Sequence, residues 1–402
     1  MIKYIYIVLA SLLILVPSSF LVGIKVGLIL LVLSVEIFRS HTVSVNYAML
    51  AGWLLVSMYY LTFSLFVTVI SGGDFGQGVL SIIYMCLVLV LSICFGRAFF
   101  RPYGQAILHA IFVCLVLYAT LKVSIVVLSL VGAVPASALI SFIEGIMPGV
   151  VFQKFDGSNY LRFATSSDVI SVYFISFYIL GGFPFRVSKP LFFAALIATA
   201  ANIVLSGTRA LILFFLICLV IKAFMLLRRQ SKLILSFVPL AIFGSALGFD
   251  LVSGFLRSGS AFATRLLDWH SLKIKLEQSI FLVKSISESP FLGRGAGSPA
   301  IIDGSKYLRH SEFQFVYENQ WLAVINQFGL LGFLIFCAPI YTIAAQLVRG
   351  RKVDFVFVPF LIFLITGFTN PNLTIISSSL IFATFGLIFY RKSIKFPIMA
   401  QR

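Results

Sequence analysis

Residues 106–132 read AILHAIFVCLVLYATLKVSIVVLSLVG, an apolar run with one charged residue, Lys122. A helix needs about 20 apolar residues to cross about 30 Å of hydrocarbon, so this run is long enough to span a membrane. Similar runs recur along the whole chain and predict about twelve transmembrane helices. The expected spans lie near residues 4–21, 22–38, 47–70, 78–96, 106–132, 166–183, 190–206, 209–227, 232–249, 320–346, 353–369 and 373–390.

The composition supports this class of protein. Of the 402 residues, 60% are hydrophobic and only 11% are charged. These values exclude a soluble globular protein. Residues 1–20 resemble a signal peptide, but more membrane sequence follows at once, so an uncleaved first helix is expected. We therefore expect one polytopic transmembrane domain over residues 1–402.

Basic residues alternate along the predicted loops and give the orientation. Short loops rich in Arg and Lys stay in the cytoplasm. The short loops 71–74 and 369–372 hold no basic residue and are expected outside. Both termini are then cytoplasmic, and the net charge of +17 comes from membrane-flanking clusters rather than from a nucleic-acid site. The basic residues of the predicted internal loops and the tail are Arg39, Arg97, Arg101, Arg186, Lys189, Arg228, Arg229, Lys232, Arg349, Arg351, Lys352, Arg391, Lys392 and Lys395.

Two longer polar segments then fall outside. The smaller covers residues 134–165 and the larger covers residues 250–317, between two membrane spans. Long external loops escape the charge rule, so their basic residues fit the topology. All five cysteines lie within expected spans, and no Cys/His spacing resembles a metal site. Because phosphate-binding, dinucleotide and nucleophile motifs are also absent from the sequence, we expect no metal or cofactor.

The larger loop has a readable internal pattern. Apolar residues recur every three or four positions over residues 263–286, which predicts an amphipathic helix suited to the outer membrane boundary. Trp269 lies near one end of this helix and is expected to anchor it, and Pro290 ends it. The following glycine stretch, residues 293–297, presents backbone N–H groups to an anion or is a plain turn. We hold both interpretations open.

Arg209 begins the eighth expected span at its external end. The preceding residues Ser206, Gly207 and Thr208 are typical of a helix N-terminus. A helix N-terminus together with a guanidinium makes a good phosphate site. The alternative is an interfacial arginine that extends to the membrane surface.

Several motifs resemble the O-antigen ligase and polymerase superfamily. Residues 206–210, SGTRA, resemble its Ser-x-(Ser/Thr)-Arg-(Gly/Ala) signature, and Arg265 with Trp269 four residues later resembles its next element. Residues 290–297, PFLGRGAG, resemble its proline, leucine and Gly-x-Gly stretch. The elements occur in the family's order.

Two further elements mark the return to the membrane. Residues 318–322, ENQWL, resemble the family's (His)-Asn-x-x-Leu element, and residues 329–332, GLLG, resemble its Gly-Leu-x-Gly helix. The resemblance covers roughly residues 195–345. It implies an all-α polytopic membrane protein of about twelve spans with a large helical periplasmic loop, a GT-C-like fold.

The resemblance also implies an activity. Such proteins are metal-independent glycosyltransferases of the bacterial inner membrane that use sugar chains carried on undecaprenyl diphosphate, facing the periplasm. Arg209 and Arg265 are expected to hold the diphosphate, with Arg294 as a third ligand. Glu318 occupies the position where ligases commonly have histidine, so it is the expected general base, and His310 is the substitute.

The missing histidine and the second external loop favour a polymerase, which joins a lipid-linked donor to a lipid-linked acceptor and works with a chain-length regulator protein. A ligase that transfers polymer to lipid A-core is the first alternative. The second alternative is a flippase or transporter, for which Lys122 is the main intramembrane ionisable candidate.

Overall fold

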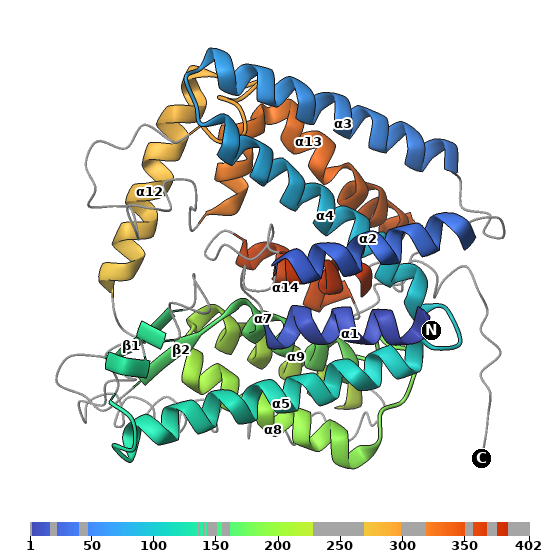
Figure 1. Ribbon diagram of the computed structural model, residues 1–402, viewed down its shortest axis with the longest axis vertical. Helices are drawn as coiled ribbons and strands as arrows, with labels where there is room; N and C mark the ends of the chain where they lie inside the picture. The colour runs from blue at the N-terminus through green and yellow to red at the C-terminus, as the bar shows by residue number, and fades with distance from the viewer. Residues whose placement is uncertain are drawn as a thin grey trace. The chain divides into compact units, whose positions relative to one another are not determined.

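The structure is a computed structural model that describes most of the helical parts of the chain (Figure 1). Contacts divide the chain into two compact units, and each unit is described by itself. The first comprises Met1–Ile29, Ala98–Asp268 and Phe355–Phe360; the second comprises Leu30–Arg97, Trp269–Asp354 and Leu361–Arg402. The described residues are 2–16, 22–39, 47–135, 137–139, 141–142, 151–154, 161–227, 269–298, 319–349, 357–367 and 376–384.

The first unit is a group of packed helices with a small hairpin. In Figure 1, α1 lies along α5, which also packs on α8, and α7 packs on both α8 and α9. Aromatic side chains fill the interior: the rings of Tyr173 and Phe177 stack at 5.7 Å between centroids, and Phe177 meets Phe183 edge-on at 4.8 Å. The elements are α1 (Ile2–Leu15), α5 (Gly104–Leu130), β1 (Val151–Lys154), β2 (Leu161–Ala164), α7 (Ser166–Ile179), α8 (Lys189–Ser206) and α9 (Arg209–Leu227).

The hairpin lies in the smaller predicted loop. Strands β1 and β2 pair antiparallel, with Phe152 opposite Phe163 and Gln153 opposite Arg162. Phe163 is buried, so strand β2 is fixed against the helices just before α7 begins. The two strands are short, and their pairing adds a small sheet that the sequence pattern did not indicate.

The second unit is built around α13, which packs against α3 and α12. Its elements are α3 (Tyr47–Ile70), α12 (Trp269–Glu288), α13 (Gln320–Arg349) and the 3-10 turn η4 (Ile376–Ser378). Three helices contribute residues to both units: α2 (Val22–Arg39), α4 (Phe75–Phe99) and α14 (Val358–Thr366). α13 is broken at Gly329, whose backbone has φ 67° and ψ 180°. The first glycine of the Gly-Leu-x-Gly element therefore breaks the helix.

The expected spans agree with the observed helices. Each expected span up to residue 227 coincides with a helix, as do 320–346 and 353–369. The span at 232–249 lies outside the described residues, and the span at 373–390 is described only over 376–384, which is helical. The predicted all-α polytopic membrane fold is confirmed, with the β1–β2 hairpin as an addition.

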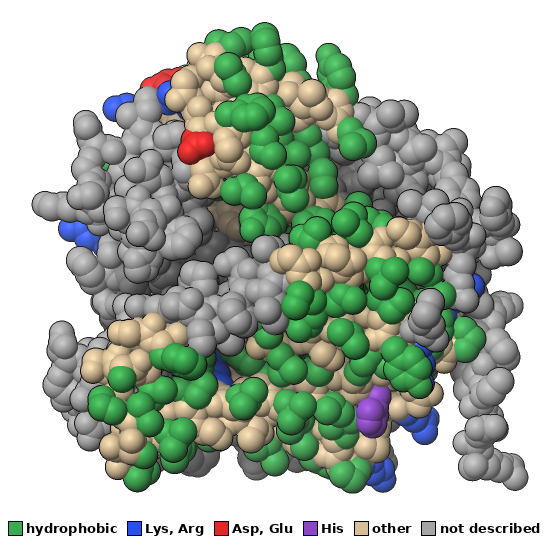
Figure 2. All heavy atoms as spheres, viewed as in Figure 1, with side chains coloured by type: hydrophobic (Ala, Val, Ile, Leu, Met, Phe, Trp, Pro, Cys, Tyr) green, Lys and Arg blue, Asp and Glu red, His purple; other side chains and the backbone are tan. Residues whose placement is uncertain are grey.

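Within the described ranges, three helices are long and apolar enough to cross a membrane: Phe75–Phe99, Gly104–Ser129 and Lys189–Ser206. Shorter apolar helices accompany them at Ile2–Leu15, Gly23–Val35, Met58–Ile70, Ser166–Ile179, Ala210–Met225 and Gln320–Ile335. Figure 2 shows hydrophobic side chains over much of the described surface and few charged ones. Large apolar side chains such as Ile197 are exposed, as expected for helices that face lipid.

The amphipathic helix predicted over residues 263–286 corresponds to α12. Its described part begins at Trp269, and residues 263–268 lie outside the described residues. The helix ends at Glu288, two residues before Pro290, as a proline after a helix end predicts. The prediction of a helix in the larger loop is therefore confirmed from Trp269 onward.

Candidate active site

The turn between α8 and α9 carries the first candidate ligand. α8 ends at Ser206 and α9 begins at Arg209, so only Gly207 and Thr208 connect them. Gly207 is left-handed, with φ 55°, and its N–H donates to the carbonyls of Ile203 and Val204 at 3.2 Å. The Ser-Gly-Thr-Arg motif, which resembles the family signature, thus reverses the chain direction, and its arginine is the first residue of the next helix.

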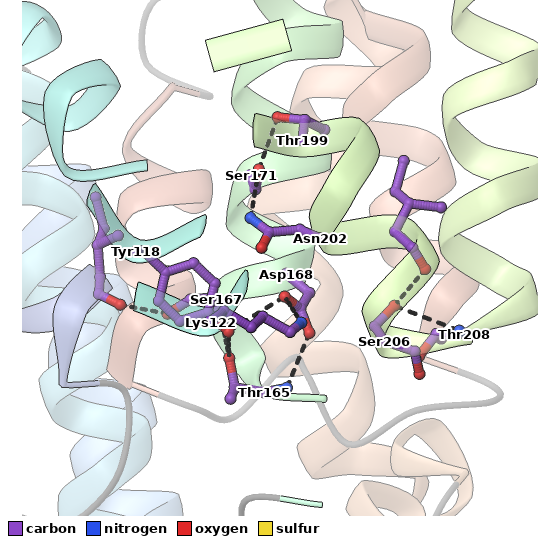
Figure 3. Close-up of polar contacts among 12 residues, drawn as sticks. Tyr118, Lys122, Thr165, Ser167, Asp168, Ser171, Thr199, Asn202, Ser206 and Thr208 are labelled. Atoms are coloured by element: carbon purple, nitrogen blue, oxygen red, sulfur yellow. Dashed lines mark hydrogen bonds and ion pairs between the residues drawn. The ribbon is translucent and has the colours of Figure 1, made fainter. Parts of the chain in front are cut away.

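Ser206 stabilises this turn with its side chain. Its hydroxyl donates to the Ile203 carbonyl at 3.0 Å and accepts from the Thr208 N–H at 3.3 Å (Figure 3). The predicted helix N-terminus is confirmed, because Arg209 is the first residue of α9. The Thr208 N–H donates to Ser206, as described, and the Leu211 N–H donates to the Thr208 carbonyl at 3.0 Å. The positive end of the helix dipole still favours an anion at this start. The Arg209 side chain lies outside the described part of the structure.

Buried polar contacts hold α8 to α7 close to this turn. The Ser171 and Thr199 hydroxyls share a hydrogen bond of 2.7 Å, and the Asn202 side-chain amide donates to the Ser171 hydroxyl at 3.5 Å (Figure 3). All three side chains are fully buried. Because Asn202 precedes Ser206 by about one helical turn, the α7–α8 contact fixes the helix end that leads to Arg209.

An ion pair lies in the same unit, between α5 and α7. The Lys122 ammonium donates to Asp168 Oδ1 at 2.7 Å, and both side chains are buried. The Tyr118 hydroxyl donates to the same oxygen at 3.2 Å and shares a 2.5 Å hydrogen bond with the Thr165 hydroxyl (Figure 3). The Lys122 ammonium also lies 5.5 Å from the centre of the Phe163 ring.

Asp168 also closes the start of α7. Its Oδ2 accepts from the Thr165 N–H at 2.9 Å, and the Thr165 hydroxyl accepts from the Ser167 N–H at 3.1 Å, which completes a capping box. The cluster thus ties strand β2, the start of α7 and the middle of α5 together. The sequence pattern identified Lys122 as an intramembrane ionisable residue, but it did not identify Asp168 as its partner. The Thr-x-x-Asp spacing at 165–168 is the signal that could have found it.

The glycine stretch is a structural turn rather than an open anion nest. The Arg294 and Gly295 N–H groups donate to the carbonyls of Asn326 and Gln327 at 2.8 and 3.0 Å. The Ala296 N–H donates to the Ser64 hydroxyl at 2.9 Å, and the Gly293 N–H donates to the Ser289 carbonyl at 3.0 Å. Four successive amides therefore have protein acceptors, which favours the plain-turn interpretation for residues 293–296.

This turn fills the break in α13. The Leu330 and Leu331 N–H groups, freed at Gly329, donate to the carbonyls of Pro290 and Phe291 at 2.8 and 3.3 Å. Backbone groups that a helix break leaves buried need such partners. The glycine stretch and the Gly-Leu-x-Gly element are consequently two halves of one backbone junction.

Arg294 lies at this junction with its side chain paired. Its guanidinium donates to Glu288 Oε2 at 2.9 Å and to the Ser285 hydroxyl at 3.5 Å. The pair is partly exposed, so it links the end of α12 to the turn at modest energetic benefit. The expected diphosphate contact of Arg294 stays a prediction.

The start of α13 explains the Asn-x-x-Leu element. Asn319 Oδ1 accepts from the Leu322 N–H at 3.2 Å, so the asparagine caps the helix, and its amide donates to Ser279 of α12 at 3.5 Å. Leu322 packs against the buried Leu282 of α12. The Gln320 N–H and the Trp321 indole donate to backbone carbonyls near the end of α14, at 2.9 and 2.8 Å. Asn319 directly follows Glu318, so the element anchors the chain next to the candidate base.

Asn319→Ala is expected to lower the free energy of unfolding by about 1 kcal/mol, because the α13 cap and the contact to Ser279 are both lost. Thermal unfolding of the purified protein in detergent measures this loss. Asn319→Asp is the matched control, since it keeps a capping oxygen and is expected to lose less. Equal losses for both variants would contradict a capping role.

The remaining candidates fall elsewhere. Arg265, His310 and Glu318 lie outside the described residues. Arg209 belongs to the first unit and Arg294 to the second, so each is described within its own unit. Among the residues that the structure describes, no three His, Cys, Asp or Glu side chains gather into a possible metal site.

Residues 194–337 match the family model described as O-antigen ligase. This segment is similar to the O-antigen ligase domain. The resemblance to the O-antigen ligase and polymerase superfamily is thereby confirmed. No curated protein matches the chain.

The O-antigen ligase-type segment contains all the predicted site residues: Arg209, Arg265, Arg294, His310 and Glu318. It also contains the α8–α9 turn and the backbone junction at Gly329. Members of this family are membrane glycosyltransferase-like enzymes, either polymerases or ligases. The Lys122–Asp168 pair precedes the matched segment, so this buried cluster belongs to the part of the chain that the family model does not cover.

Proposed function

We propose that the chain is an O-antigen or polysaccharide polymerase, a glycosyltransferase that joins oligosaccharide repeat units carried on undecaprenyl diphosphate. The observation that carries this proposal is the α8–α9 turn, where the family-like Ser-Gly-Thr-Arg motif starts a membrane helix with Arg209. A guanidinium at a helix N-terminus suits a diphosphate.

The reaction balances without a metal or cofactor. A hydroxyl of the acceptor sugar attacks the anomeric carbon of the donor sugar, and the bond from that carbon to the phosphate oxygen breaks. Undecaprenyl diphosphate leaves with the bonding electron pair. Arg209 and Arg265 stabilise its charge through paired hydrogen bonds, and Arg294 is a third candidate.

A general base takes the proton of the attacking hydroxyl. Glu318 is the first candidate, because it precedes Asn319, and Asn319 is fixed between α12 and α13. His310 is the substitute. The acceptor proton ends on this base and passes to water when the product leaves.

The choice of polymerase over ligase rests on Glu318, together with the second external loop predicted at residues 134–165. Glu318 stands where the ligase element commonly has histidine. The ligase remains the second candidate, because the matched family model is described as O-antigen ligase. A ligase would pass the same donor chain to lipid A-core instead of to a second lipid-linked chain.

Transport is the third candidate, and the Lys122–Asp168 pair bears on it. Buried ionisable groups in membrane helices often mark transport paths. Here Asp168 lies in the first turn of α7 and its carboxylate caps that helix, so the pair has a structural function at a helix end. The pair therefore gives no support to a transporter.

The proposal also covers the cellular location of the protein and its binding partners. The protein lies in the bacterial inner membrane with both termini in the cytoplasm, and the loops 134–165 and 250–317 face the periplasm. The partners are a lipid-linked donor, a lipid-linked acceptor and a membrane protein that regulates chain length. The predicted charge pattern of the short loops supports this orientation.

Deletion of the gene, followed by gel analysis of lipopolysaccharide, separates the candidates. Loss of a polymerase leaves core that carries a single repeat unit. Loss of a ligase leaves bare core while lipid-linked polymer accumulates. Loss of a flippase leaves bare core and lipid-linked single repeats. A normal ladder would exclude all three.

Complementation of the deletion tests the residue roles. We expect Arg209→Ala, Arg265→Ala and Glu318→Ala to leave core with a single repeat, at wild-type amounts of membrane-inserted protein. Arg209→Lys should restore only part of the polymer, because an ammonium lacks the paired donors of a guanidinium.

Lys189→Ala is the matched control, since Lys189 is an exposed cation at the opposite end of α8. It should support a normal ladder. Normal polymer from all three site variants would exclude the proposed site.

A further inference from the structure

α12 buries two polar side chains and exposes a stripe of large apolar ones. Gln278 and Ser285 are buried, at 4% and 2% exposure. Leu276, Ile280 and Val283 are 61%, 59% and 54% exposed. At about 100° per residue, these two sets lie on opposite sides of the helix. The pattern is the reverse of that of a helix on a water-soluble domain.

The contacts of the inward face fix this orientation. Leu282 is fully buried and packs with Leu322 and Ala323 of α13. Ser279 accepts from the Asn319 amide at 3.5 Å, at the start of the same helix. α12 is therefore anchored on α13 through its inward face, which leaves the stripe of Leu276, Ile280 and Val283 on the outside.

The described neighbours of α12 are ends of membrane helices. The turn that follows it reaches the α3–α4 turn, where the Asp74 N–H donates to the Gly297 carbonyl at 3.1 Å. The α13 start that it contacts is bonded to the end of α14, from the Gln320 N–H to the Gly367 carbonyl at 2.9 Å. In the predicted topology these helix ends lie at the outer membrane boundary, so α12 is expected at that boundary as well.

The surface around the stripe has the composition of a lipid contact. Apolar exposure continues past the helix end at Phe291 and Leu292, at 63% and 42%. Removing such side chains from water is favourable, so the stripe favours an apolar environment. The exposed Lys284 lies along one edge of the stripe, as does Lys273, whose side chain is 72% exposed and lies 4.0 Å from the Glu277 carboxylate. Lysines beside an apolar stripe suit contact with lipid phosphates.

We infer that α12 is a lipid-contact helix: Leu276, Ile280 and Val283 insert among the acyl chains at the membrane boundary, and Lys273 and Lys284 contact anionic headgroups. The occupant of the stripe is the bilayer itself rather than a protein partner. This inference does not depend on the proposed reaction, because it rests on packing and exposure in the second unit alone.

Fluorescence of an environment-sensitive dye on single introduced cysteines tests it. The dye is placed at Leu276→Cys, Ile280→Cys or Val283→Cys, and the protein is reconstituted in phosphatidylethanolamine–phosphatidylglycerol vesicles. Glu288→Cys, which is exposed and lies off the stripe, is the control. The native cysteines are buried or partly buried in membrane helices, and the unsubstituted protein measures their background labelling.

We expect blue-shifted emission at the three stripe positions and about threefold stronger quenching by acyl-chain nitroxide lipids than at Glu288. Iodide in the water should quench the stripe less than the control. Stripe positions open to iodide would overturn the inference, as would positions shielded from both quenchers, which would indicate a protein cover.

A second comparison tests the contribution of the two lysines to lipid binding. Lys273→Gln combined with Lys284→Gln should reduce the nitroxide quenching in phosphatidylglycerol vesicles and leave it unchanged in phosphatidylcholine vesicles. Because these vesicles contain no undecaprenyl lipid, a positive result identifies bilayer lipid as the occupant. Equal quenching in both lipids before and after the change would exclude the headgroup contact.

Discussion

Gly295→Ala is expected to prevent accumulation of folded protein, whereas Gly72→Ala is expected to be tolerated. Gly295 has φ 93°, and a Cβ there would lie 2.4 Å from the backbone nitrogen of Thr68. Gly72 has φ 69°, and a Cβ there would meet nothing within 4 Å. Both changes carry the left-handed backbone cost of about 1–2 kcal/mol, so the difference between them isolates the clash.

The clash at Gly295 cannot be relieved by a side-chain rotation, because the crowded atoms include backbone atoms of α3. The substitution must therefore push the turn away from α3 and break the junction with α13, at a total cost of about 3 kcal/mol or more. Gly329→Ala should behave in the same way, since its Cβ would lie 2.2 Å from the Phe291 carbonyl oxygen.

Membrane abundance and size-exclusion profiles in detergent measure these outcomes. Gly295→Ala and Gly329→Ala should give little monodisperse protein, and Gly72→Ala should give nearly the wild-type amount. Wild-type yield and unfolding temperature for Gly295→Ala would show that the turn does not pack against α3.

Lys122→Met is the second change with a large expected effect. It leaves the Asp168 carboxylate buried without its cation, and breaking a buried pair in this way costs about 3–5 kcal/mol. Asp168→Asn leaves the Lys122 ammonium buried without its anion and should cost a similar amount. The double variant should recover most of the loss, because the introduced side-chain amide still presents an oxygen to the Thr165 N–H and no charge remains unpaired.

A double-mutant cycle on the free energy of unfolding measures the coupling between the two residues. We expect the double variant to be more stable than either single variant. Lys189→Met is the control for loss of a lysine, and its effect should stay within about 0.5 kcal/mol because Lys189 is exposed. Additive losses from Lys122→Met and Asp168→Asn would show that the pair is not a unit.

Hydropathy predicted the membrane helices well because each span is a local property of the sequence. The boundaries of α3 at Tyr47–Ile70 and of α9 at Arg209–Leu227 match the expected spans. The α8–α9 turn was also predictable, since Ser206, Gly207 and Thr208 act within four residues of one another. Contacts between residues this close in the chain can be predicted from the sequence.

Long-range partners were not predictable from the same patterns. Asp168 lies 46 residues from Lys122, and the hydroxyl of Ser64 that binds the glycine stretch lies 232 residues from Ala296. No periodicity connects such positions. Glycine at 293–297 was compatible with an anion nest and with a turn, and only the acceptors supplied by α3 and α13 distinguish them.

In the candidate site, too, local contacts were easier to predict than contacts between distant residues. The pairing of Arg294 with Glu288, six residues away, joins the end of α12 to the following turn, and the spacing of residues within a helix does not predict it. The capping role of Asn319, by contrast, was readable from its place before a helix. The proposed roles of Arg209, Arg265 and Glu318 rest on the motifs and on the chemistry expected of a departing diphosphate.

Reconstitution of the purified protein with undecaprenyl diphosphate-linked repeat units tests the glycosyltransferase proposal most directly. The reaction is run with a metal chelator, and its products are followed by mass spectrometry. We predict lipid-linked dimers and longer chains, with one undecaprenyl diphosphate released for each new glycosidic bond, and none of these products from Arg209→Ala. Unchanged substrate with folded wild-type protein, or transfer only to added lipid A-core, would contradict a polymerase.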